Sequence, residues 1–151
     1  MAYMEWTRDL ECGIPVIDTQ HKHIVDFINE LDDVCQTGNI KNIQHVIEGL
    51  LKYTETHFDF EEELQEKAEY PYIKAHRRIH DNFRKKVATF RERSTKGEDI
   101  AHELLTLLNG WLVSHIKSED RDYVESVKPF ANSDNQEVTG WMSTTLKKFF
   151  G

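Results

Sequence analysis

Cysteine and proline are scarce in this chain, and long apolar runs are absent. Its 151 residues include two cysteines, Cys12 and Cys35, which are far apart and form no CxxC pair. This argues against a disulfide framework or a thiolate metal site, so we expect both to act as small hydrophobic side chains. No apolar run approaches the roughly 20 residues that cross a bilayer, and the N-terminus has no signal-peptide pattern. We therefore expect a cytoplasmic protein without a membrane span.

Positive charge is also in short supply. The chain has 19 Lys and Arg against 27 Asp and Glu, a formal net charge of −8. Nucleic-acid binding needs a basic stripe, whereas the basic residues here are scattered among carboxylates. We expect no nucleic-acid partner. The length fits one domain of ordinary size.

Apolar residues recur in steps of four and three, the spacing of one face of an α-helix, along four segments. None of the three prolines interrupts these segments. We expect Asp18 to be the N-cap of the first helix and Pro71 to lie in the first turn of the third. The four predicted helices span about residues 18–37, 40–68, 71–96 and 100–128.

Helices with short connections between them favour antiparallel neighbours. The sequence therefore predicts an all-α, up-down-up-down four-helix bundle over residues 1–128, with an extended N-terminal arm. Residues 129–151 are expected to form a polar linker, at 130–137, and a short amphipathic helix, at 141–150. That tail could dock on the bundle, pair two subunits, or address a protein partner or a membrane surface.

Histidine is the residue type that stands out. Of eight histidines, five lie on the four helical seams that should face the bundle axis, and Glu61 shares the second seam. A buried polar group without a partner costs about 1–3 kcal/mol, so five on one axis need a common partner. Any one of them alone would be interpreted as a hydrogen-bonded core residue. The five are His21, His57, His76, His80 and His115. We expect the other three, His23, His45 and His102, to be solvated.

The spacing of these residues indicates a metal site. His57 with Glu61, and His76 with His80, are i, i+4 pairs that present two donor atoms to one point. His115 and Asp120 are five residues apart, about 140° on a regular helix. For Asp120 to reach the same site, the helix must loosen or end between them.

Five imidazoles and two carboxylates are too many ligands for one ion. If Glu61 and Asp120 each bridge two ions, three imidazoles are left for one ion and two for the other. Imidazole and carboxylate suit iron, copper, nickel or zinc, and bridging carboxylates favour iron. The Glu-x-x-His pair of ferritin-like di-iron proteins is absent.

Four segments carry a resemblance to a known family. GIPVIDTQHK at 13–22, HFDFEE at 57–62, YPYIKAHRRIH at 70–80 and WLVSHIKSED at 111–120 resemble the motifs of the hemerythrins, specifically the single-domain bacterial kind. The resemblance covers about residues 5–128, and all seven ligand positions match in order and spacing.

The resemblance implies two iron ions per chain, bridged by two carboxylates and a solvent-derived oxo or hydroxo group. One iron keeps an open position, where dioxygen binds in the family. The implied ligands are His76, His80 and His115 on one iron, His21 and His57 on the open iron, and Glu61 and Asp120 as bridges. The implied oxygen pocket, whose residues would equally serve as ordinary core, is Ile24, Phe58, Trp111, Leu112 and Ile116.

The expected function is reversible dioxygen binding, for storage, delivery or sensing, and not catalysis. Two carboxylates and one hydroxide against two Fe(II) leave a net charge of about +1, which disfavours the highly oxidised states that oxygenases use. One alternative is a di-iron enzyme acting on peroxide, nitric oxide or ferrous iron. Another is a bundle in which metal only staples the helices.

Overall fold

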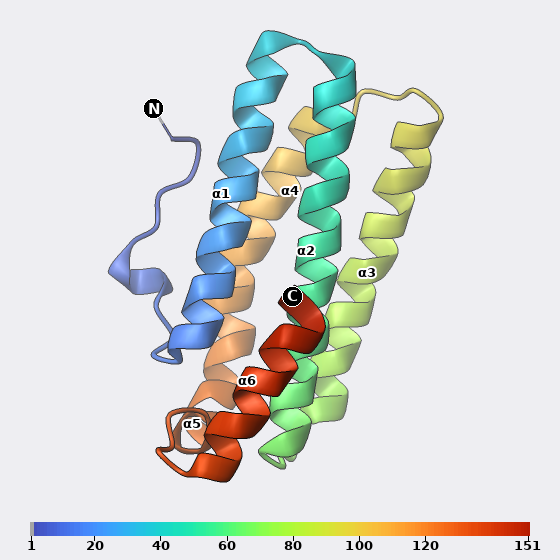
Figure 1. The fold of residues 1–151 in the computed structure, drawn as a ribbon. Helices are drawn as coiled ribbons and strands as arrows, with labels where there is room; N and C mark the ends of the chain where they lie inside the picture. Colours follow the sequence, from blue (N-terminus) through green and yellow to red (C-terminus); the bar gives the residue numbers. More distant parts are fainter. Residues whose placement is uncertain (1) are drawn as a thin grey trace.

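The computed structural model describes residues 2–151, and every regular element of the described chain is a helix (Figure 1). No helix in this part is long and apolar enough to cross a membrane. The predicted all-α class is confirmed. The elements in chain order are η1 (Arg8–Leu10), α1 (Pro15–Thr37), α2 (Ile40–Lys67), α3 (Ile73–Thr95), α4 (Ala101–Ser114), η2 (His115–Glu119), α5 (Asp120–Ala131) and α6 (Gln136–Phe150).

Four long rods form the bundle. α1, α2 and α3 alternate in direction, and α4, η2 and α5 continue one another as the fourth rod (Figure 1). α1 packs against α2 and α4, and α2 also packs against α3. Stacked rings of Phe83 and Trp111, 4.0 Å apart, join α3 to α4. The arrangement is the predicted up-down-up-down bundle.

The N-terminal arm lies along the outside of α1 (Figure 1). The amide N–H of Met4 donates to Oδ1 of Asn29 at 2.8 Å, and Nδ2 of Asn29 donates back to the carbonyl of Met4 at 2.9 Å. Met4 and Leu10 are both buried against the bundle. The arm is therefore tied to α1 by hydrogen bonds as well as by apolar contact.

The first helix begins earlier than predicted. α1 starts at Pro15, because proline has a helical φ and lacks the N–H that a cap would satisfy. Asp18 is therefore not the N-cap: its carboxylate accepts the N–H groups of Cys12, at 2.8 Å, and Gly13, at 3.2 Å. That prediction was wrong, and Asp18 instead fixes the loop that precedes the helix.

The third helix begins later than predicted. Pro71 lies in a turn outside the helix, and α3 starts at Ile73. The turn follows Glu69, which has a positive φ of 59°. Tyr70 is buried there with its ring 6.0 Å from that of Tyr123. Burial of this ring fixes the turn, so the proline cannot also start the helix.

The fourth rod continues past Pro129, where we expected it to end. Pro129 lies inside α5, which ends two residues later at Ala131. A proline this close to a helix end removes only one hydrogen bond, so the last turn survives. The break before the tail covers only residues 132–135, a shorter linker than predicted.

The tail docks on the bundle. α6 begins at Gln136, five residues earlier than predicted, and lies over the lower half of α2 (Figure 1). The rings of Phe149 and Phe150 lie 6.4 and 6.0 Å from that of Phe60 on α2. Lys148 forms an ion pair with Glu63 at 2.7 Å. Of the three possibilities for the tail, the structure shows docking.

Two apolar clusters fill the core, and a polar layer separates them. On α1, His21 lies between Ile17 of one cluster and Ile24 of the other. On the fourth rod, Asp120 lies between Ile116 and Tyr123 in the same way. The polar layer therefore crosses the whole bundle and is enclosed by hydrocarbon on both sides.

Candidate metal centre

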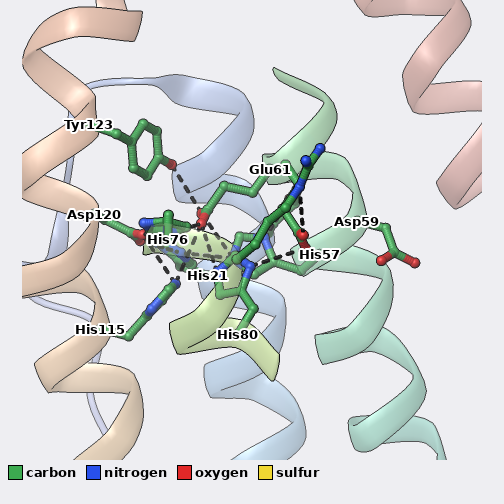
Figure 2. A network of polar contacts seen from close by, with 12 residues as sticks. His21, His57, Asp59, Glu61, His76, His80, His115, Asp120 and Tyr123 are labelled. Atoms are coloured by element: carbon green, nitrogen blue, oxygen red, sulfur yellow. Dashed lines mark hydrogen bonds and ion pairs between the residues drawn. The ribbon is translucent and has the colours of Figure 1, made fainter. Parts of the chain in front are cut away.

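The polar layer contains all seven residues that the sequence singled out (Figure 2). They come from α1, α2, α3 and the fourth rod, and their side chains converge between the helices. Six are completely buried, and His76 is 4% exposed. The seven are His21, His57, Glu61, His76, His80, His115 and Asp120.

The backbone loosens where the spacing required it. Residues His115–Glu119 form a π-helical turn, and the N–H of Asp120 donates to the carbonyl of His115. A π turn holds one more residue than an α turn, so residues five apart come to the same side. Oδ1 of Asp120 lies 3.1 Å from Nε2 of His115. The predicted loosening of the helix is confirmed.

Glu61 contacts histidines on both sides with different oxygens. Its Oε1 lies 2.6 Å from Nε2 of His76 and 3.1 Å from Nε2 of His80. Its Oε2 lies 3.4 Å from Nε2 of His57. A carboxylate placed in this way can give one oxygen to each of two ions.

The two oxygens of Asp120 also face different histidines. Its Oδ1 faces His115 at 3.1 Å, and its Oδ2 faces His21 at 3.2 Å. Two sets of four donors, each within 4.8 Å of one another, could hold an ion, and they share Glu61 and His115. The contact with Oδ1 of Asp120, which also lies 3.8 Å from His76, favours placing His115 with His76 and His80. The geometry thus supports three histidines on one side and two on the other.

Several polar atoms of this layer have no hydrogen-bond partner among the described residues. They are Nδ1 of His21, both ring nitrogens of His115 and both oxygens of Asp120. Buried polar atoms without a partner are rare in proteins because their desolvation is not compensated. Lone pairs that face one buried space, as on Asp120, fit a cation.

Burial keeps three of the imidazoles neutral. It lowers the pKa of His21 to about 4 and that of His57 to about 3. Burial also lowers the pKa of His115 well below its usual range. Neutral imidazole is the form that binds metals. His80 differs, because hydrogen bonds to Glu61 and Glu62 outweigh its burial and raise its pKa to about 9.

The two carboxylates have opposite pKa shifts. Burial favours the neutral form of Glu61, but hydrogen bonds from His76 and His80 hold its pKa well below the usual range. Burial raises the pKa of Asp120, and the negative charge of Glu61 raises it further. Two buried carboxylates this close repel each other when both are ionised, and a cation between them removes that repulsion.

Three further residues hold the candidate ligands in place. Nδ1 of His57 donates to Oε1 of Gln20 at 2.6 Å, and Nδ1 of His80 donates to Oε2 of Glu62 at 3.2 Å. The hydroxyl of Tyr123 donates to Oε2 of Glu61 at 3.0 Å. Such contacts orient a ligand and select the ring nitrogen that faces the metal.

The sequence reasoning missed these three. Gln20 is three residues after Ile17, and Tyr123 is three after Asp120, so helical spacing could have found both. Glu62 gives no such signal, although its side chain is only 13% exposed. It meets His80 across two helices, a contact that spacing along one helix does not reveal.

The five residues assigned to an oxygen pocket surround the polar layer on one side. Four are buried and Trp111 is half-buried. The Phe58 ring stacks on His80 with centroids 4.0 Å apart, and Trp111 stacks on His115 at 4.9 Å. Phe58 also lies 5.9 Å from His57. Both aromatic rings thus contact the three-histidine side directly, and the assignment of an oxygen pocket stays a prediction.

The remaining histidines lie away from the centre. His23, His45 and His102 are exposed on the bundle surface. The fold and the polar layer together define a class: a helical bundle with a buried set of histidine and carboxylate donors arranged for two cations.

Comparison with known proteins identifies the family within this class. Residues 12–127 match the family described as "Hemerythrin HHE cation binding domain". The chain is 45% identical over 154 residues to the bacteriohemerythrin of Stenotrophomonas maltophilia (strain R551-3), with full coverage of both proteins. It is 43% identical to that of Pseudomonas aeruginosa (strain LESB58), again over the full length of both. The chain belongs to the hemerythrin family.

Solved structures agree. A crystal structure of wild-type hemerythrin superposes with a TM-score of 0.79 at 30% identity, covering 83% of this chain and 98% of the other. The crystal structure of a mutant hemerythrin gives a TM-score of 0.80 over 84% of this chain. Those shorter proteins are thus covered almost completely, while about a sixth of this chain lies outside the match.

Proposed function

We propose that this protein binds dioxygen reversibly at a non-haem di-iron centre, for storage, delivery or sensing. The observation that carries the proposal is the division of the donors by the two carboxylates. Each carboxylate directs one oxygen to the three-histidine side and the other to the two-histidine side. One iron would therefore receive one protein ligand fewer than the other and keep a position for dioxygen.

The chain's residues would hold and shield this centre. His76, His80 and His115 would bind one iron, His21 and His57 the other, and Glu61 and Asp120 would bridge them, with a solvent-derived oxo or hydroxo group as a third bridge. When bound, the iron pair supplies the two electrons that dioxygen takes up on binding and returns on release. The apolar clusters above and below exclude water. A dry site without an external acid would limit further reaction of dioxygen held there.

An anaerobic-to-aerobic absorption titration with an iron count tests the proposal. We expect two irons per chain and a charge-transfer absorption that appears in air and disappears on deoxygenation. A protein that purifies with one zinc and no visible colour contradicts it.

The same preparation tests the other functions. Multiple turnovers with peroxide, nitric oxide or ferrous iron would indicate an enzyme, since a carrier shows only stoichiometric binding and slow autoxidation. A large loss of stability without metal, combined with no dioxygen binding, would indicate a structural metal. A cytoplasmic location and a protein partner for the tail stay predictions from the sequence.

A further inference from the structure

Three tyrosines connect the polar layer to the surface. Tyr123 is completely buried, and its hydroxyl donates to Glu61 at 3.0 Å (Figure 2). Its ring centroid lies 6.0 Å from that of Tyr70, which is 6% exposed. Tyr70 lies 5.9 Å from Tyr72, which is 69% exposed. The three rings thus form a continuous series of aromatic contacts from a proposed bridging carboxylate to water.

The outer end of this series opens into a hollow. A cavity of about 420 Å³ is lined by Tyr70, Tyr72, Ile79, Asp122 and His76. His76 is the candidate ligand with measurable exposure, and it lines this cavity. Among the described residues, Tyr72 is one of two large hydrophobic residues that are exposed, the other being Tyr3. The surface therefore reaches the edge of the metal layer at the point where the tyrosine series ends.

We propose that this tyrosine series carries oxidising equivalents from the iron pair to the surface when hydrogen peroxide reacts there. The proposal rests on the proposed function, because it requires the iron pair. Tyrosine gives up one electron together with its phenolic proton, and a neighbouring tyrosine can refill it. Phenylalanine cannot do this, so a series made only of tyrosines, Tyr123, Tyr70 and Tyr72, is suited to stepwise transfer.

Electrons and protons balance over two successive one-electron transfers, each called a passage here. One hydrogen peroxide takes up two electrons and two protons to give two waters. In each passage an electron moves inward from Tyr72 through Tyr70 and Tyr123, and Tyr72 releases its proton to the surrounding water. A soluble phenol or ascorbate then returns a hydrogen atom to the Tyr72 radical. The second passage completes the reduction of the peroxide.

The inner tyrosines have bases beside them. Tyr123 can pass its proton along the hydrogen bond to Oε2 of Glu61 and take it back when Tyr70 refills it. Tyr70 shares the hollow with the carboxylate of Asp122.

A second possible route for the oxidising equivalent lies on the other side of the polar layer, through Trp111. Trp111 stacks on His115 at 4.9 Å and is half-buried, so it could lose an electron in a single step. The test must therefore locate the radical and not only detect it.

Radical trapping locates the exit. The iron-loaded protein is treated with hydrogen peroxide and the spin trap 2-methyl-2-nitrosopropane, digested, and mapped by mass spectrometry. We expect the adduct on Tyr72. Tyr70→Phe keeps the ring but interrupts the transfer, so the adduct on Tyr72 is lost. The matched control is Tyr3→Phe, which removes an exposed tyrosine outside the series and leaves the Tyr72 adduct unchanged.

Three results would overturn the proposal. Adducts on Tyr3 as abundant as those on Tyr72 would indicate freely diffusing radicals. Adducts on Trp111 with none on Tyr72 would indicate the other exit. An unchanged Tyr72 adduct in Tyr70→Phe would show that the series is not the route.

Iron content and dioxygen binding, measured on the same preparations, separate the two hypotheses. Two irons with normal dioxygen binding but no Tyr72 adduct overturn this inference alone. A protein with no iron pair and no adduct overturns both. Should Tyr70→Phe lose its iron, Tyr72→Phe replaces it, with the radical then expected on Tyr70 or Tyr123.

Discussion

The two sides of the metal layer use the same imidazole donors in different surroundings. On the two-histidine side, the second ring nitrogen of His57 meets the neutral amide of Gln20. On the three-histidine side, His80 meets the carboxylate of Glu62, which Arg84 holds at 2.7 Å. Burial lowers the pKa of His57 to about 3, whereas Glu61 and Glu62 raise that of His80 to about 9 against its burial. Identical ligands thus have unequal surroundings, and a site can treat two like ions differently.

Glu61→Ala should disrupt both sides of the metal layer, because Glu61 contacts both. We expect the iron content to fall from two per chain to near zero, since each ion loses a ligand and the bridge between them. Elemental analysis of the purified protein measures this. Glu66→Ala, on the exposed surface of the same helix, is the control and should keep both irons. A Glu61→Ala protein that retained one tightly bound iron would show that Glu61 belongs to one side only.

Single histidine changes should remove one side at a time. His57→Ala is expected to lose the iron of the two-histidine side first, and His80→Ala that of the three-histidine side. Iron analysis with Mössbauer spectroscopy distinguishes which iron is left. His45→Ala, an exposed histidine of α2, should leave both irons. If both variants kept two irons and normal oxygen binding, the ligand assignment would be wrong.

Protonation should distinguish His57 from His80 in the metal-free protein. Burial lowers the pKa of His57 to about 3 and of His21 to about 4, so between pH 6.5 and 4 the unfolded chain binds more protons and acid destabilises the fold. His80 has its pKa raised to about 9 by Glu61 and Glu62 against its burial. Its contribution is present below pH 6.5 and is lost as the pH rises to 9.

Urea unfolding of the metal-free protein from pH 4 to 9 measures these slopes. We expect the free energy of unfolding to be highest near pH 6.5, with each group contributing on the order of a few kcal/mol. His57→Gln should flatten the acid limb and His80→Gln the alkaline limb. Equal effects of both variants on both limbs would remove the electrostatic distinction between these two ligands.

The smallest effects should come from the groups behind the ligands. Gln20→Ala is expected to weaken iron binding on the two-histidine side, and Glu62→Ala on the three-histidine side, each by about 10- to 100-fold. Competition with a chelator measures the affinity of each iron. Glu63→Ala, beside Glu62 but paired with Lys148, serves as the control. If Gln20→Ala weakened both irons equally, the two sides would not be independent.

The centre was largely predictable because its ligands lie on regular helices. Apolar spacing placed His21, His57 and His115 on inward faces, and the five-residue gap to Asp120 required the π turn that the structure contains. The helix ends were less predictable. Pro71 and Pro129 both have strong local preferences, but burial of Tyr70 and the proximity of a helix end determined the outcome.

Contacts between helices explain what sequence reasoning missed. Glu62 is hidden because His80 and Arg84 approach it from another helix, and no spacing along α2 signals that approach. The docking of α6 depends in the same way on where Phe60 faces, which only the packed bundle determines. The periodicity of apolar residues along one helix indicates its inward face. It does not indicate which residue of the neighbouring helix a given side chain will contact.

The π turn shifts the helical register of the fourth rod by one residue. Before it, inward positions include Leu108 and Leu112, and after it they include Asp120 and Val127, one residue out of step with the earlier series. A π turn holds one residue more than an α turn, so deleting the exposed Lys117 would let the turn close as an α turn, with His115 and Asp120 four residues apart and still on one side. Inserting a further residue there would instead rotate everything after it by about 100° away from the axis. The turn therefore has room for a deletion and none for an insertion.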